Sequence, residues 1–124
     1  MKKHSIEIVS KIELTDEDID DLMVTALEGG INNWCGEVKA KLVPEDVKYE
    51  YLSELIAKSG VIELTDAENE DEKWDLNLSK FMNGVKMVCE ERSFNSGEEL
   101  MDNHDAEVAD SLIQFALFNE IVFG

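Results

Sequence analysis

The sequence predicts an α+β fold, with a mainly antiparallel sheet of about four strands backed by helices in the order β-α-β-α-β-β-α-α. Apolar residues alternate with polar ones in several short segments, as in half-buried strands, and recur at helical spacing in longer ones. Two strand segments flank a short acidic stretch, which indicates a hairpin. With 124 residues, 44% of them hydrophobic, the chain is expected to form a single globular domain over residues 1–124.

The first strand and the first helix are expected to follow one another directly. Residues 6–14 alternate between apolar and polar side chains, which predicts a strand with one buried face. Thr15 is a candidate N-cap, and the acidic residues after it crowd a first turn where the helix dipole favours them. A helix is therefore predicted from about Asp16 to Glu28.

The adjacent Gly29 and Gly30 are expected to end this helix. A phosphate-binding loop needs the opposite order, with the glycines before a helix, so that amide N–H groups and the positive end of the dipole face the anion. We therefore interpret the two glycines as a left-handed C-cap and turn. A second strand is predicted from Trp34 to Leu42, with Trp34 on the core face and Cys35 opposite it.

The middle of the chain predicts a second helix and then a hairpin. Pro44 suits the first turn of a helix, and Gly60 is expected to end it. The apolar run 61–65 and the alternating run 73–78 follow, on either side of the acidic residues 66–72. This order predicts a β-hairpin around a solvated loop.

The last third of the chain predicts two helices separated by a loop. Ser79 is expected to cap a third helix that runs to about Glu91. The stretch 92–105 has no usable period and is rich in polar and turn-forming residues, which predicts a long loop. Asp105 is expected to cap a last helix, after which residues 120–124 end the chain as a strand or a docked tail.

The charge of the chain restricts its partners. Eleven basic residues stand against 29 acidic ones, so the formal net charge is −18. A protein this acidic repels the nucleic-acid backbone, and direct binding to DNA or RNA is not expected. The same field favours a cationic protein surface, a metal ion, or a protein groove that would otherwise hold nucleic acid. The alternative is that the charge serves only to keep the protein soluble.

The compartment is predicted to be the cytoplasm. No apolar run approaches the roughly 18 to 20 residues of a membrane span, and the first residues lack the uninterrupted apolar segment of a secretion signal. We therefore expect no membrane partner. Cys35 and Cys89 are expected to be reduced and to behave as small hydrophobic side chains, because both lie among apolar neighbours.

Two patterns are candidates for chemistry. Residues 66–72 carry a carboxylate at every second position, but they lack the central glycine and the glutamate spacing of a calcium loop, so a solvated hairpin tip is the alternative. Cys35 or Cys89 with His104 or His4 would make a nucleophilic dyad, but a negative field raises thiol pKa values unless a cation intervenes. We expect no catalytic, cofactor-binding or metal-binding residue, and no enzyme activity.

Acidic clusters over 16–21, 66–72 and 98–110 are candidate contact sites, because spaced carboxylates on a rigid scaffold imitate a run of phosphates. Ordinary solvated faces are the alternative. The C-terminal aromatic residues exceed what one helical stripe buries, which indicates a partner or self-association surface unless the tail closes the core. The predicted partner-binding residues are Asp16, Glu17, Asp20, Asp21, Glu68, Glu70, Asp71, Glu72, Phe115 and Phe118.

Three stretches carry a family resemblance: TALEGGINNWC at residues 25–35, ADSLIQFALFNEIVFG at residues 109–124, and LTDEDIDDLM at residues 14–23. They resemble a widespread group of small acidic proteins found in phages, prophages and mobile elements of Firmicutes. Members of that group commonly keep the order helix, Gly-Gly, Trp-Cys. The group has no assigned catalytic residues, so the resemblance implies a mobile-element protein without implying an activity.

These observations predict a small, non-enzymatic antagonist of a host nucleic-acid-binding defence protein, which it would engage through that protein's basic surface. One alternative is a binder that sequesters a small ligand such as a signalling nucleotide. Against it, Arg92 is the only arginine in the chain, and nucleotide phosphates need several basic or amide groups. A second alternative is a structural module that forms a homo-oligomer through the C-terminal aromatic residues.

Overall fold

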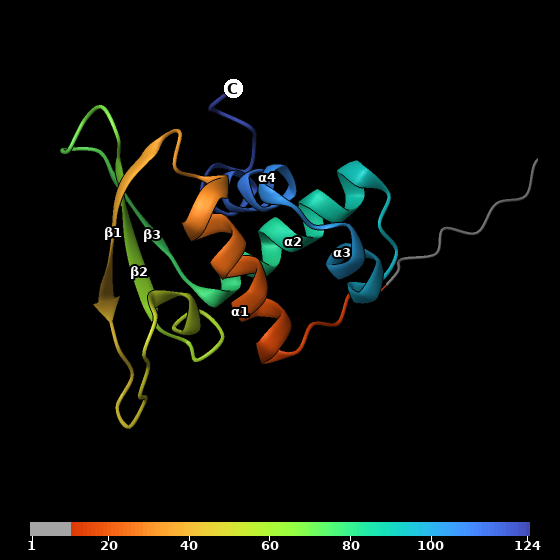
Figure 1. Cartoon of the computed structure of the whole chain (residues 1–124), viewed down its shortest axis with the longest axis horizontal. Coiled ribbons are helices and arrows are strands. Elements are labelled where there is room, and N and C mark those ends of the chain that lie inside the picture. The colour runs from red at the N-terminus through yellow and green to blue at the C-terminus, as the bar shows by residue number, and fades with distance from the viewer. Residues whose placement is uncertain (1–10) are drawn as a thin grey trace, which may run out of the picture.

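The computed structural model describes residues 11–124, and its architecture is α+β, as the sequence predicts. Figure 1 shows the sheet on one side of the molecule and the helices gathered on the other. The α-helices and strands, in chain order, are α1 (Asp16–Thr25), β1 (Cys35–Leu42), β2 (Val61–Asp66), β3 (Lys73–Leu76), α2 (Leu78–Arg92), α3 (Gly97–Asn103) and α4 (Ala106–Phe118). A π-helical turn, η1 (Ala26–Gly30), extends α1, and a 3-10 turn, η2 (Leu52–Glu54), lies between β1 and β2.

The strands form an antiparallel sheet in the order β1-β2-β3. Its inward face carries apolar residues in register, with Ala40 opposite Ile62 and Ile62 opposite Leu76. The predicted hairpin is confirmed, since β2 pairs with β3. A fourth strand is not confirmed, because residues 1–10 lie outside the described part of the chain and residues 11–15 have no strand pairing. The predicted order of elements is therefore not confirmed.

The predicted second helix is wrong, and the geometry of the sheet explains why. Leu42 at the end of β1 is paired with Val61 at the start of β2, so the connection returns to where it began. A straight helix over the same stretch would carry the chain about 20 Å away at 1.5 Å per residue. The chain instead bends at Asp46, whose φ of 66° lies in the left-handed region, and continues through the short 3-10 turn η2 and further turns at residues 55–59.

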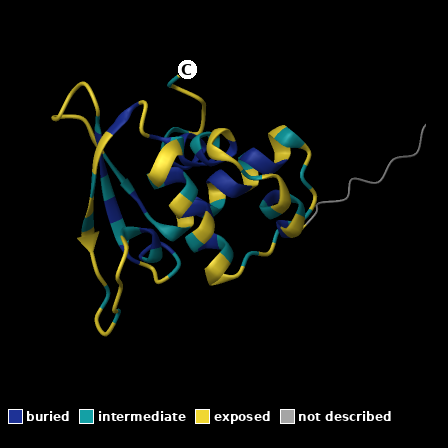
Figure 2. Ribbon diagram, in the orientation of Figure 1, coloured by how far each residue is buried: buried dark blue, intermediate teal, exposed yellow. Residues whose placement is uncertain are grey.

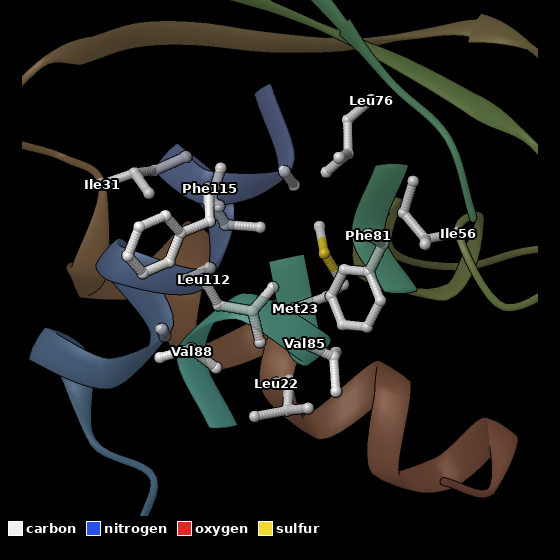
Figure 3. Close-up of a cluster of buried hydrophobic side chains, with 14 of the residues drawn as sticks. Leu22, Met23, Ile31, Ile56, Leu76, Phe81, Val85, Val88, Leu112 and Phe115 are labelled. Carbon is white, nitrogen blue, oxygen red and sulfur yellow. The ribbon is translucent and has the colours of Figure 1, made fainter. Parts of the chain in front are cut away.

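The hydrophobic core lies between the sheet and the helices and continues between the helices, as the dark-blue segments of Figure 2 show. In Figure 3, Met23 of α1, Phe81 of α2 and Leu112 of α4 meet in one cluster. Each of these side chains is at most 1% exposed. Helical spacing of apolar residues places them on the inward face of each helix. Within residues 11–124, no helix combines the length and apolarity needed to cross a bilayer.

The helix caps agree with the sequence prediction at two of three positions. Thr15 caps α1, and Asp105 caps α4 by accepting a hydrogen bond from a backbone amide of the first turn at 2.9 Å. Ser79 does not cap α2. Asn77 takes that role, because its side-chain oxygen accepts a hydrogen bond from the Lys80 amide at 2.9 Å. The helix therefore begins slightly earlier than predicted.

The predicted left-handed C-cap at Gly29 and Gly30 is wrong. Neither glycine has a positive φ, and both lie in the π-helical turn η1. A Cβ atom on Gly30 would come within 2.9 Å of the carbonyl oxygen of Ala106 at the start of α4. The glycine is therefore needed for close packing of two helical segments rather than for an unusual backbone conformation.

The C-terminal residues dock against α4 as a tail. Gln114 of α4 is 1% exposed, and its side-chain oxygen accepts hydrogen bonds from the amides of Val122 and Phe123, each at 2.8 Å. The Phe123 ring stacks on Trp34, with centroids 5.0 Å apart and planes 5° apart. Trp34 lies in the core, as predicted, and is 4% exposed.

Candidate functional site

A surface groove of about 890 Å³ lies between α1, α2, α3 and the segment that precedes α1. In Figure 1 this is the region in which the red segment before α1 runs towards α3. We call it the acidic groove. The residues that line it are Ile12, Glu13, Leu14, Thr15, Asp18, Met82, Glu98, Met101 and Asp102.

The first wall of the acidic groove is fixed by a capping box at the start of α1. The Thr15 hydroxyl accepts a hydrogen bond from the Asp18 amide at 3.1 Å, and an Asp18 carboxylate oxygen accepts one from the Thr15 amide at 3.0 Å. These reciprocal bonds satisfy backbone N–H groups that have no partner within the helix. They hold the Asp18 carboxylate in a defined place at the wall of the groove.

The second wall is formed by α3, which the sequence predicted as a loop. Ser96 caps this helix by accepting a hydrogen bond from a backbone amide of the first turn at 3.0 Å. Next to it, a Cβ atom on Gly97 would lie 2.0 Å from the Glu13 carbonyl oxygen, so only glycine lets α3 rest against the segment before α1. This contact places Glu98 and Asp102, one helical turn apart, along the groove.

Three of the four carboxylates of the acidic groove form no ion pair within residues 11–124. Its lining includes four carboxylates and, over residues 11–124, no lysine or arginine. Asp18, Glu98 and Asp102 take part in none of the ion pairs of that region, while Glu13 pairs with the exposed Lys11. Glu98 and Asp102 are like charges four residues apart on one helix, which costs about 0.2–0.5 kcal/mol. Binding of a cation would relieve this repulsion.

The apolar lining of the groove comes from side chains that are only partly buried. Ile12, Leu14, Met82 and Met101 pack against the edge of the core while still lining the groove. Methionine is unbranched and polarisable, so it adapts to ligands of different shapes. The alternation of Ile12 and Leu14, which predicted a strand, therefore reflects packing against helices. The groove combines these apolar side chains with carboxylates from three segments of the chain.

The predicted acidic residues of α1 have two different environments. Asp16, Glu17 and Asp21 are exposed. Asp20 is half-buried, and burial, followed by the nearby Glu54 carboxylate, raises the pKa of its side chain. One of its carboxylate oxygens is buried and makes no hydrogen bond to any residue of the described chain.

The predicted acidic residues of the hairpin lie far from the groove. Asp66 organises the turn, because one of its carboxylate oxygens accepts hydrogen bonds from the amides of Glu68 at 2.7 Å and Asn69 at 3.1 Å. In Figure 1 the tip of the β2–β3 hairpin and α3 lie at opposite ends of the long axis. The structure thus brings together parts of the first and third acidic clusters and separates the second. The exposed hairpin residues are Glu68, Glu70, Asp71 and Glu72.

The predicted aromatic contact residues pack within the chain. Phe115 is 8% exposed, and Phe118 is half-buried. Phe118 belongs to an aromatic cluster in which six ring pairs have centroid separations of 5.0 to 6.1 Å. This cluster joins the start of β1, β3, the end of α4 and the tail. Its members are Trp34, Trp74, Phe118 and Phe123.

Within residues 11–124, neither cysteine forms a hydrogen bond with His104. The Cys35 thiol donates to the Glu37 carbonyl oxygen at 3.4 Å, and His104 Nδ1 lies 2.7 Å from the Met101 carbonyl oxygen. Burial raises the pKa of the thiols of Cys35 and Cys89, which lowers their thiolate fraction at neutral pH. Within residues 11–124, no group of three or more His, Cys, Asp or Glu side chains is arranged to hold a metal ion.

The lysines of the sheet are balanced by neighbouring acids on its outward face. Lys41 Nζ lies 2.8 Å from an Asp75 carboxylate oxygen, and Lys39 Nζ lies 3.5 Å from one of Glu63. Lys73 also lies within 3.8 Å of Glu63. The lysines of these pairs are exposed to solvent, which weakens the contribution of the pairs to stability. Their effect is that this face of the sheet carries mixed charge, in contrast to the acidic groove.

Comparison with known proteins gives no match to a protein-family model, a curated protein or a solved structure. What the protein does therefore has to follow from its own residues and geometry.

The acidic groove was missed at the sequence level because its residues come from segments far apart in the chain. No local pattern joins Glu13 to Glu98 or Met82. One signal for its second wall was present, because Ser96 is followed three residues later by Glu99, which is the spacing of a capping box. That spacing predicts the start of a helix where polar composition alone predicted a loop.

Proposed function

We propose that this protein is a non-enzymatic binding protein that occupies the basic surface of a nucleic-acid-binding protein and thereby keeps nucleic acid away from it. The observation that supports this proposal most directly is the acidic groove, in which carboxylates from three segments converge and, among residues 11–124, only Glu13 is paired with a cation, the exposed Lys11. Complementary charge steers two proteins together and selects among partners. The net charge of −18 extends the same attraction over the whole molecule.

The class of partner follows from the chemistry of phosphate recognition. A surface that binds nucleic acid presents Lys and Arg side chains to a series of phosphates. Carboxylates held at fixed spacing on α1 and α3 can pair with the same side chains. The resemblance to proteins of phages and mobile elements makes a host defence protein of this class the partner that we propose.

A signalling nucleotide is a poorer fit. Arg92, the one arginine of the chain, lies 3.6 Å from carboxylate oxygens of both Glu91 and Glu107. The acidic groove offers carboxylates where a nucleotide needs cationic or amide groups. Phosphate groups would therefore be repelled from this groove.

The proposal is tested by affinity capture with the full-length protein from lysate of a Gram-positive host, at low and at high salt. We expect recovery of a nucleic-acid-binding protein that high salt releases, because the contact is electrostatic. Competing duplex DNA should displace the captured protein, since both ligands use one basic surface. Recovery of no such protein even at low salt would contradict the proposal.

Two variants, each with three carboxylates neutralised, test whether the captured protein binds at the groove. The groove variant carries Glu13→Gln, Glu98→Gln and Asp102→Asn. The hairpin variant carries Glu68→Gln, Glu70→Gln and Glu72→Gln at exposed positions. Loss of the partner in both variants to the same degree would show that net charge acts without the groove.

A further inference from the structure

We infer that the acidic groove receives a basic amphipathic helix of the partner, with its apolar side chains against the groove's apolar lining and its Lys or Arg side chains against the two acidic walls. The inference rests on the proposed function and names the segment of the partner that the protein recognises. It follows from the combination of two chemistries in one groove, because neither a purely polar surface nor a purely apolar one would match both.

The apolar part of the groove requires an apolar contact. Ile12, Leu14, Met82 and Met101 line it and are only partly buried by the rest of the chain. Covering them would remove apolar surface from water, which favours binding. A partner with only charged side chains would leave this contribution unused.

The walls of the groove set the spacing of the charges. Glu98 and Asp102 lie four residues apart on α3, which separates their Cβ atoms by about 5–6 Å. On a partner helix, basic residues three or four apart have the same separation. Glu13, from the segment before α1, and Asp18, from the first turn of α1, provide the other two carboxylates of the groove. A helix with basic residues flanking an apolar stripe therefore matches both walls at once.

The probe is a synthetic peptide of about 14 residues, or four helical turns, made of Leu and Lys placed on opposite faces of a helix. A second peptide has the same composition in scrambled order, so it carries the same charge without an apolar face. We expect the amphipathic peptide to bind the full-length protein at least about 10-fold more tightly than the scrambled one. Equal affinity for the two peptides would overturn the inference.

The groove and hairpin variants described above locate the binding. The groove variant should bind the amphipathic peptide about 10-fold or more weakly, and the hairpin variant should stay within about 2-fold of the parent. Equal weakening in both would show attraction by net charge alone. If affinity capture recovers a nucleic-acid-binding protein that the groove variant retains, the proposed function stands and this inference fails.

Methionine methyl resonances report the contact directly. In protein labelled with ¹³C at the methionine methyl groups, the peptide should shift the resonances of Met82 and Met101, which line the groove. The resonances of Met23, which is fully buried, and of Met87, which contacts Asn83 on α2, should stay in place. Shifts at the latter pair without shifts at the former would overturn the inference.

The same spectra test a competing occupant, which is the basic N-terminal segment of the chain itself. Lys2 and Lys3 precede the groove residue Ile12 in the sequence. A Lys2→Gln, Lys3→Gln variant should leave the free-protein resonances of the groove methionines unchanged. If it shifts them, and the variant binds the peptide more tightly than the parent, the groove belongs to the chain's own segment and the inference is overturned.

Discussion

Replacing Gln114 with leucine removes the polar group that holds the C-terminal tail. The side chain is 1% exposed, and its oxygen accepts the amides of Val122 and Phe123, both at 2.8 Å. Its nitrogen donates to an Asp110 carboxylate oxygen at 3.0 Å and to the Phe123 carbonyl oxygen at 3.2 Å. Leucine has a similar size and can make none of these bonds, so the substitution separates hydrogen bonding from packing.

The expected loss follows from these four bonds. Each is worth about 0.5–1.5 kcal/mol net, and the freed amides of the tail can turn to water, so the total should be about 2–4 kcal/mol in the free energy of unfolding. Undocking the tail also removes Phe123 from Trp34, on which it stacks at 5.0 Å. Tryptophan emission should therefore shift to the red in the folded state.

Urea unfolding followed by tryptophan fluorescence measures both effects, because the only two tryptophans of the chain belong to the aromatic cluster. Ser111→Ala on the same helix is the control and should change the free energy of unfolding by less than about 0.5 kcal/mol. Adding Phe123→Ala to Gln114→Leu should cost less than the sum of the single losses, since either change frees the tail. A loss below about 0.5 kcal/mol for Gln114→Leu, with unchanged emission, would refute the reasoning.

Three further predictions concern positions where the chain is constrained. Gly97→Ala should lower the melting temperature and weaken peptide binding together, because a Cβ would lie 2.0 Å from the Glu13 carbonyl oxygen. A lower melting temperature with unchanged peptide binding would show that the packing of α3 does not shape the binding site. Asp20→Asn should be more stable than the parent at neutral pH in urea titrations, because burial and then Glu54 raise the pKa of that carboxyl, so its ionised form opposes folding. Its advantage should shrink as the pH falls through the raised pKa towards about 4, and Glu70→Gln, at an exposed site, should show no such trend. Both thiols should react slowly with iodoacetamide in the folded protein at neutral pH and faster in urea, because burial raises their pKa; equal rates in the two states would contradict their burial.

The parts of the fold that the sequence predicts well are those in which local pattern and tertiary packing agree. The β2–β3 hairpin and α4 have strong periodicity and their own turn or cap residues, such as Asp105. The 43–60 connection fails for a tertiary reason, since its ends must meet where Leu42 pairs with Val61. Helical spacing over part of that stretch carries no information about this closure requirement.

The ends of helices show a second limit of local pattern. α2 and α4 both end in left-handed residues that are not glycine, at Ser93 and Asn119, with φ of 60° in each. The true glycine pair, Gly29–Gly30, instead serves close packing against α4. The residue types at a helix end therefore indicate that the helix stops there. The backbone conformation of those residues depends on which segments pack against the helix end.

The distribution of charge distinguishes the acidic groove from the hairpin as a proposed contact site. At physiological ionic strength the screening length is about 8 Å, so carboxylates at the far end of the molecule hardly affect a ligand in the groove. The lysines of the sheet are balanced by Glu63 and Asp75. We therefore expect the net charge to draw the proposed basic partner towards the protein, and the contact to form where carboxylates lie beside the partly buried apolar side chains of the groove. This distinction between attraction and contact makes the hairpin variant, with its identical charge change, the proper control for the groove.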